Sequence, residues 1–71
     1  MNPTRVIFAV QDVLRGKASG LFLIRAVERL EAARDDKQAL RDAVRQIAKM
    51  AKIFLTEHEA AALERLAQQI D

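Results

Sequence analysis

The stretch that decides the fold is residues 36–54, which read DKQALRDAVRQIAKMAKIF. Its apolar side chains are spaced four, three, four and three residues apart, and this spacing places them on one face of an α-helix. They are Leu40, Val44, Ile47, Ala51 and Phe54. Two heptads are too few to indicate a coiled coil. The pattern therefore predicts an amphipathic helix over residues 36–54 that packs against other helices.

The N-terminal half of the chain also carries helix signals. Helix breakers are rare, because the 71 residues include only two glycines and one proline. Asn2 before Pro3 is typical of an N-cap and the first helical residue, and Gly16 is placed to end that helix in a left-handed conformation. Ser19 can cap the next helix. These signals predict helices over about residues 3–15 and 20–34.

Two capping boxes divide the C-terminal half. Thr56 with Glu59 predicts a last helix over about residues 57–70. Its inner face is formed by Leu63, Leu66, Ala67 and Ile70. Asp35 with Gln38 has the same form and predicts a break between the second and third helices. One continuous helix stays an alternative there, because no glycine or proline lies between Ala32 and Ala39.

A strand at the N-terminus is a second alternative. Residues 4–10, TRVIFAV, are rich in strand-forming types and fit the first strand of a ribbon-helix-helix DNA-binding dimer. Neither face of such a strand is polar enough to contact base edges. A helix is therefore preferred, and apolar residues 6–10 then cover most of its circumference, which favours burial on nearly every side.

The fold predicted is all-α, with three to four short helices that form helical hairpins in one small domain over residues 1–71. A chain this short buries only about 60% of the surface it exposes when unfolded, so a monomer is expected to be marginal. We therefore expect a homodimer that completes a helical bundle. The predicted interface for the dimer or for another partner consists of Val6, Ile7, Phe8, Val10, Leu14, Leu21, Phe22 and Ile24.

Few residues could carry chemistry. The chain lacks cysteine, which excludes disulfides and thiolate metal sites. His58, the only histidine, lies between Glu57 and Glu59, and neighbours in a helix point about 100° apart, so the three cannot converge on one metal ion. The hydroxyl residues fit helix starts, and residues 16–20, GKASG, lack the spacing of a phosphate-binding loop. We expect no enzyme, no metal and no cofactor.

The charge pattern of residues 37–55 is more informative. Five bases lie on one arc of the predicted helix, beside its apolar face, and Asp42 is the only acid in the stretch. The bases, called the basic stripe below, are Lys37, Arg41, Arg45, Lys49 and Lys52. They are either solvated or paired with the acidic residues of 56–71, or they bind a polyanion, with Arg25 and Arg29 as an extension. All three phenylalanines fit core positions, which disfavours stacking on single strands and leaves duplex DNA as the polyanion.

Two functions follow from these patterns. The first is a non-enzymatic helical module that binds a protein partner through an apolar surface, as an adaptor, chaperone or inhibitor. The alternative is a small dimeric regulator that binds duplex DNA through the basic stripe. A membrane partner is disfavoured, because the helix of residues 37–55 lacks tryptophan and needs its apolar face for packing. The longest apolar runs are far shorter than the roughly 18 residues that span a bilayer, so a cytoplasmic protein is expected.

Overall fold

The computed structural model describes residues 2–70, and within them the chain is helical without any strand. The four α-helices are α1 (Pro3–Leu14), α2 (Gly20–Ala33), α3 (Lys37–Met50) and α4 (Glu57–Gln68). A short 3-10 helix, η1 (Ala51–Ile53), continues α3. The all-α prediction is confirmed, and the strand predicted as an alternative at residues 4–10 is wrong because these residues belong to α1.

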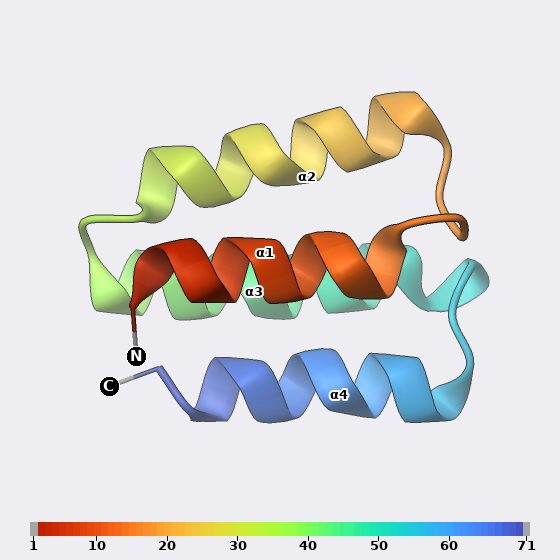
Figure 1. Ribbon diagram of the computed structural model, residues 1–71. Helices are drawn as coiled ribbons and strands as arrows, with labels where there is room; N and C mark the ends of the chain where they lie inside the picture. The colour runs from red at the N-terminus through yellow and green to blue at the C-terminus, as the bar shows by residue number, and fades with distance from the viewer. Residues whose placement is uncertain (1, 71) are drawn as a thin grey trace.

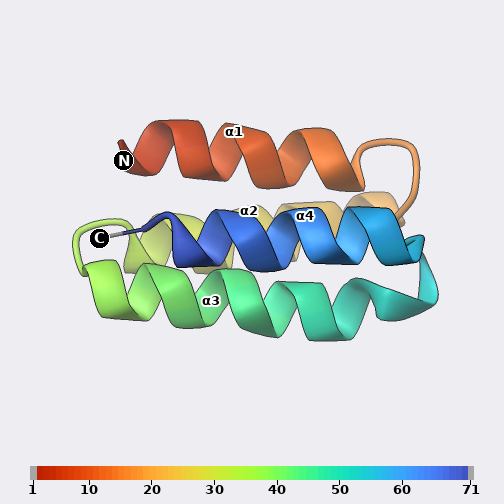
Figure 2. The ribbon, with the colours of Figure 1, turned by 90° about the horizontal axis from the view of Figure 1, so that it is seen from below.

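Each helix packs against the next and runs in the opposite direction, and α4 returns to contact α1 (Figure 1). Seen from below, α1 and α3 lie on opposite sides of α2 and α4 (Figure 2). One end of the molecule therefore carries the loops after α1 and α3. The other end carries the α2–α3 loop and both ends of the described chain.

The helix ends follow the local signals. The Asn2 side chain accepts a hydrogen bond from the Thr4 amide, and the Ser19 side chain accepts one from the Phe22 amide. Gly16 has φ +78°, the left-handed conformation that favours glycine. Thr56 caps α4 in a complete capping box, because the Glu59 side chain accepts from the Thr56 amide in return. These four sequence predictions are confirmed.

The break between α2 and α3 is also real, but its cap is displaced by one residue. Asp36, not Asp35, is the N-cap: its Oδ1 accepts from the amides of Gln38 at 3.0 Å and Ala39 at 3.2 Å. These amides are the second and third of the helix, which an N-cap carboxylate reaches best. The predicted start at residue 36 is therefore one residue early, and a continuous α2–α3 helix is excluded.

One apolar core fills the space between the helices, and no polar side chain of residues 2–70 is buried in it. Its members come from all four helices and η1: Val6, Ile7, Val10, Leu14, Ala26, Leu30, Leu40, Ala43, Val44, Ile47, Ala48, Ala51, Leu63, Ala67 and Ile70. The accessible surface of the chain is 4588 Å², close to the roughly 4450 Å² typical of a compact monomer of 8.0 kDa. The chain alone thus reaches the compactness expected for its mass.

Two expected core positions are not in the core. Phe8 is 59% exposed, because α1 is covered by α2 on one side and α4 on the other and its outer side faces solvent. Phe54 lies beyond α3, in the turn after η1, and is 37% exposed. The expectation that α1 is buried on nearly every side is therefore wrong.

None of the helices in the described part has the length and apolar character needed to cross a membrane.

Candidate functional site

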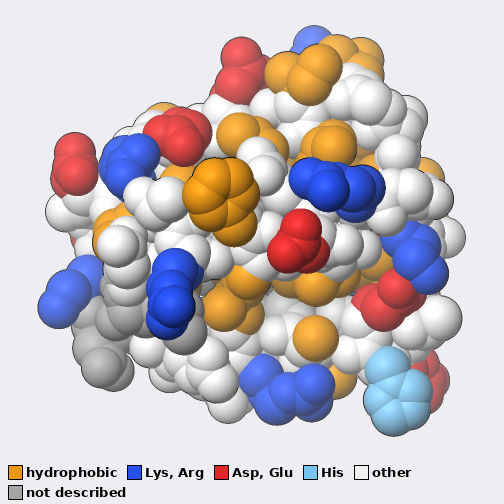
Figure 3. Space-filling view, viewed as in Figure 1, with side chains coloured by type: hydrophobic (Ala, Val, Ile, Leu, Met, Phe, Trp, Pro, Cys, Tyr) orange, Lys and Arg blue, Asp and Glu red, His pale blue; other side chains and the backbone are white. Residues whose placement is uncertain are grey.

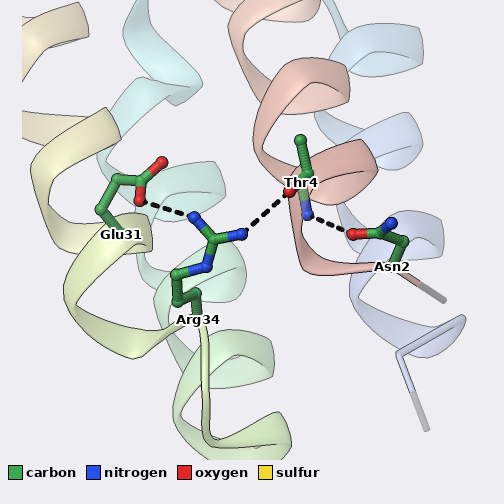
Figure 4. Close-up of polar contacts among 4 residues, drawn as sticks. All are labelled: Asn2, Thr4, Glu31 and Arg34. Carbon is green, nitrogen blue, oxygen red and sulfur yellow. Dashed lines mark hydrogen bonds and ion pairs between the residues drawn. The ribbon is translucent and has the colours of Figure 1, made fainter.

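The end that carries the α2–α3 loop is closed by polar contacts. Arg34, at the end of α2, donates to Thr4 Oγ1 of α1 through Nη2 at 2.9 Å and to Glu31 Oε2 through Nη1 at 3.0 Å (Figure 4). Asn2 accepts from the Thr4 amide beside this contact. The guanidinium therefore joins the end of α2 to the start of α1.

Arg41 makes a second tie at the same end. Its Nη2 donates to the Ile70 carbonyl at 2.6 Å, and its Nη1 donates to Gln38 Oε1 at 2.8 Å. The Ile70 carbonyl lies just past α4, where carbonyls lack partners within the helix and a cation is favoured. The half-buried Arg41 thus holds α3 to the end of α4, and we call this end of the molecule, with Arg34 and Arg41, the polar end.

The opposite end exposes large apolar side chains. Leu21 is 62% exposed at the start of α2, Met50 is 45% exposed at the end of α3, and Ile53 of η1 is 85% exposed. The rings of Phe22 and Phe54 meet edge to face, with centroids 5.3 Å apart, which links the start of α2 to the turn after η1. We call this set the apolar patch: Leu21, Phe22, Met50, Ile53 and Phe54.

A groove runs from the apolar patch between α2 and α3. Its deepest part is a pocket of about 130 Å³ lined by Phe22, Arg25, Ala26, Arg29 and Met50. A shallower hollow continues past Arg29 toward the polar end, over alanines of both helices, with Asp42 and Gln46 on the α3 side. Arg29 Nη1 donates to Gln46 Oε1 at 2.6 Å across it. We call the pocket and the hollow together the α2–α3 groove.

One ion pair joins the loops at the end that bears the apolar patch. Lys17 Nζ lies 2.7 Å from Glu59 Oε2. The Lys17 ammonium lowers the pKa of the Glu59 carboxyl, and the Thr56 amide, which donates to Oε1 at 2.8 Å, lowers it further. The cap of α4 and the loop after α1 are thereby held together.

The predicted interface is divided by the fold. Val6, Ile7, Val10 and Leu14 are buried against helices of their own chain, so they are not available to a second copy or to another protein. The other four reach the surface: Phe8, Leu21, Ile24 and the half-buried Phe22. Ile24 points about 160° away from Phe22 on α2. We therefore count Leu21 and Phe22 in the apolar patch, and Ile24 is exposed one turn beyond Leu21, on the side of α2 away from Phe22.

The face formed by α1, α2 and α4 differs from the patch. Its hydrophobic side chains lie between charged ones and form no continuous area (Figure 3). Phe8 is the exposed large apolar residue of α1. It provides a matched reference for the apolar patch, because it is equally exposed on another helix.

The basic stripe is largely free. Lys37, Arg45, Lys49 and Lys52 are exposed, and none of them forms an ion pair within residues 2–70. Arg41 is occupied at the polar end, as described above. The predicted pairing of the stripe with the acidic start of α4 is not found in this part of the chain, where Glu59 pairs with Lys17 instead.

Sequence reasoning missed Met50, Ile53 and the α2–α3 groove. Ile53 carried a signal, because it is a large apolar residue that falls outside the four-three spacing of the α3 face. The groove carried none, since the distance between α2 and α3 depends on how they pack.

Neither a metal site nor a relative directs the functional argument. Within residues 2–70 no three His, Cys, Asp or Glu side chains are close enough to hold a metal ion, and His58 is exposed. No family model matches the chain, and comparisons with curated proteins and with solved structures give no significant match.

Proposed function

We propose that the chain is a non-enzymatic module that binds another protein through the apolar patch. The observation that carries this proposal is the exposure of Leu21, Met50 and Ile53 at one end of a molecule whose core is otherwise well filled. Clustered exposed apolar side chains mark interaction sites, whereas single ones are ordinary. Phe22 and Phe54 extend the cluster across two helices.

The energetics favour this surface over the one expected from the sequence. Covering apolar area contributes about 25 cal/mol per Å², but only for atoms that are exposed before binding. Val6 and Val10 have already made that gain inside the core, so Phe8 is the large apolar side chain of α1 that remains exposed for a partner. The exposed side chains of the apolar patch would still gain this free energy when a partner covers them.

Site-specific photo-cross-linking in the native cells tests the proposal. A benzophenone side chain placed at Ile53 should give a discrete protein adduct, and one at Gln38, exposed at the polar end, should give none. The adduct should disappear when Met50→Asp is added and persist when Phe8→Asp is added. Equal labelling from both positions, or none from Ile53, would overturn the proposal.

Duplex DNA is the second candidate, supported by the four exposed stripe bases without ion pairs in the described chain. Four phosphate contacts predict a log–log salt slope of about −3.6. The test is anisotropy of a labelled mixed-sequence duplex over a salt series, with Lys37→Glu/Arg45→Glu as the disrupting variant. Arg41 is unsuitable for this purpose because it also holds α4. Binding that survives the double variant, or no binding at low salt, would exclude the stripe as a DNA surface.

A further inference from the structure

We infer that the α2–α3 groove receives an acidic amphipathic helix of a partner protein, an inference that rests on the proposed function and specifies the partner segment. The apolar face of that helix would cover the apolar patch and place one side chain in the pocket. Its acidic residues would lie against the bases that border the groove.

The shape of the groove fits one helix. The pocket has a volume of about 130 Å³. A cavity of about 150 Å³ accepts a benzene-sized apolar group, so the pocket has room for one large apolar side chain. Four of the seven residues that line the neighbouring hollow are alanines of α2 and α3, over which a helix backbone can approach closely, and the other three are Arg29, Asp42 and Gln46. The alanines are Ala32, Ala33, Ala39 and Ala43. A helix that follows the groove meets the pocket and the hollow in succession.

The charges around the groove favour one sign of charge on the partner helix. Arg25 and Arg29 line the pocket, and Lys49 and Lys52 directly precede Met50 and Ile53 in the chain. None of these four bases has an acidic partner within 4.0 Å among residues 2–70. Arg29 bonds only a neutral amide, Gln46. Among the residues that line the groove, Arg25 and Arg29 are bases and Asp42 is an acid, so an acidic helix is complementary and a basic one is disfavoured.

Other occupants fit less well. The described chain has no strand, so it offers no sheet edge to an extended peptide. The acidic helix α4 of a second copy is not free, because Leu63 and Ala67 are buried in its own core and Glu59 pairs with Lys17. A lipid surface would reach the exposed Leu21 and Ile53 but would leave the pocket beside Met50 unfilled, whereas a helix can cover both.

Labelled synthetic peptides test the inference on the whole chain. Two peptides of the length of α3, 14 residues, share apolar residues at i, i+3, i+4 and i+7 and carry either Glu or Lys at the polar positions. Fluorescence anisotropy at about 0.05 M salt should show the acidic peptide binding at least about tenfold more tightly, and the difference should shrink at about 0.5 M. Arg25→Glu/Arg29→Glu should reverse the preference, whereas the control Arg5→Glu/Arg15→Glu on the α1 side should keep it.

Met50→Asp should abolish binding of both peptides, and the equally polar change Phe8→Asp should leave it intact; circular dichroism confirms that each variant is folded. Equal affinity for the two peptides would overturn the charge argument. If neither peptide binds, the inference that a helix occupies the groove is wrong. The same conclusion holds if the chain instead self-associates in sedimentation or adsorbs to anionic phosphatidylserine vesicles. In these cases the proposed function still stands if the benzophenone at Ile53 gives its protein adduct. If that adduct is also missing, both proposals are wrong.

Discussion

The two ends of the molecule join neighbouring helices through different kinds of contact. At the polar end, Arg34 and Arg41 carry hydrogen bonds from one helix to another, and none of the large apolar side chains exposed within residues 2–70 lies beside these contacts. At the opposite end, α2 and η1 meet through two phenylalanine rings, and Leu21, Met50 and Ile53 remain in solvent.

The difference shows which end of this small fold is closed by its own contacts and which end keeps exposed apolar side chains. Guanidinium contacts hold the polar end together without needing further apolar contact, so a partner would gain little there. The end with the apolar patch keeps apolar area that only another molecule can cover. The polar ties and the surface proposed for binding therefore lie at opposite ends of the same pair of helices, α2 and α3.

The largest expected effect separates a buried residue near the polar end from an exposed one in the patch. Leu40→Ala should cost about 2–5 kcal/mol of unfolding free energy, because Leu40 is 1% exposed and its removal leaves a cavity. Ile53→Ala should change stability by less than about 0.5 kcal/mol. Urea denaturation measures both, and a cost at Ile53 near that at Leu40 would mean that the patch is part of the folded core.

The next effect concerns the polar tie. Arg41→Ala should cost about 1 kcal/mol, since it removes a charged donor from the part-buried contact with the Ile70 carbonyl. Arg45→Ala, one turn further along α3 and without a hydrogen bond among the described side chains, should be near neutral. Thermal unfolding of the two variants side by side checks this, and equal midpoints would show that Arg41 does not hold α4.

The α3 cap gives a comparable but more local effect. Asp36→Ala should cost about 1 kcal/mol, because two backbone amides lose their acceptor. Asp35→Ala should cost clearly less, although the sequence pattern pointed to Asp35. A larger loss from Asp35→Ala than from Asp36→Ala would restore the sequence-based assignment.

The smallest effect is the pH dependence of the Lys17–Glu59 contact. The folded-state pKa of Glu59 is lowered, so its contribution to stability is present above the unfolded value and is lost as the pH falls below about 5 through the folded value. Glu59→Gln should therefore reduce the difference in melting temperature between about pH 6 and pH 3, while Glu57→Gln in the same turn should not. An unchanged difference in Glu59→Gln would show that the contact is too weak to matter.

Local signals in the sequence predict the helices well. Asn2, Ser19 and Thr56 act within three residues of themselves, so the sequence contains everything that their caps require. The buried face of α3 follows from its spacing at Leu40, Val44, Ile47 and Ala51. Among the predicted caps the one at Asp35 is displaced, because two adjacent aspartates offer equivalent caps and the fold uses the second. The predicted end of this helix at residue 54 is also late, because α3 ends at Met50 and continues as η1.

The surface proposed for binding was harder to predict because it depends on which helices become neighbours. Residues 6–10 are apolar on all sides of α1, and the sequence does not say that α2 and α4 leave the side with Phe8 open. Ile53 lies off the apolar face of α3, and its position next to Phe54, whose ring meets Phe22, follows from the 3-10 turn η1. Arg41 has the spacing of a solvated base and becomes structural only because α4 ends next to it.

The most direct measurement of the central claim is methyl NMR of the folded chain during titration with the acidic peptide. The methyl groups of Met50 and Ile53 report on the end with the apolar patch, and those of Ile7 and Ile70 report on the core near the polar end. We predict saturable shifts at Met50 and Ile53 with little change at Ile7 and Ile70. Saturable shifts centred on Ile7 and Ile70, with Met50 and Ile53 unchanged, would contradict the assignment of binding to the apolar patch.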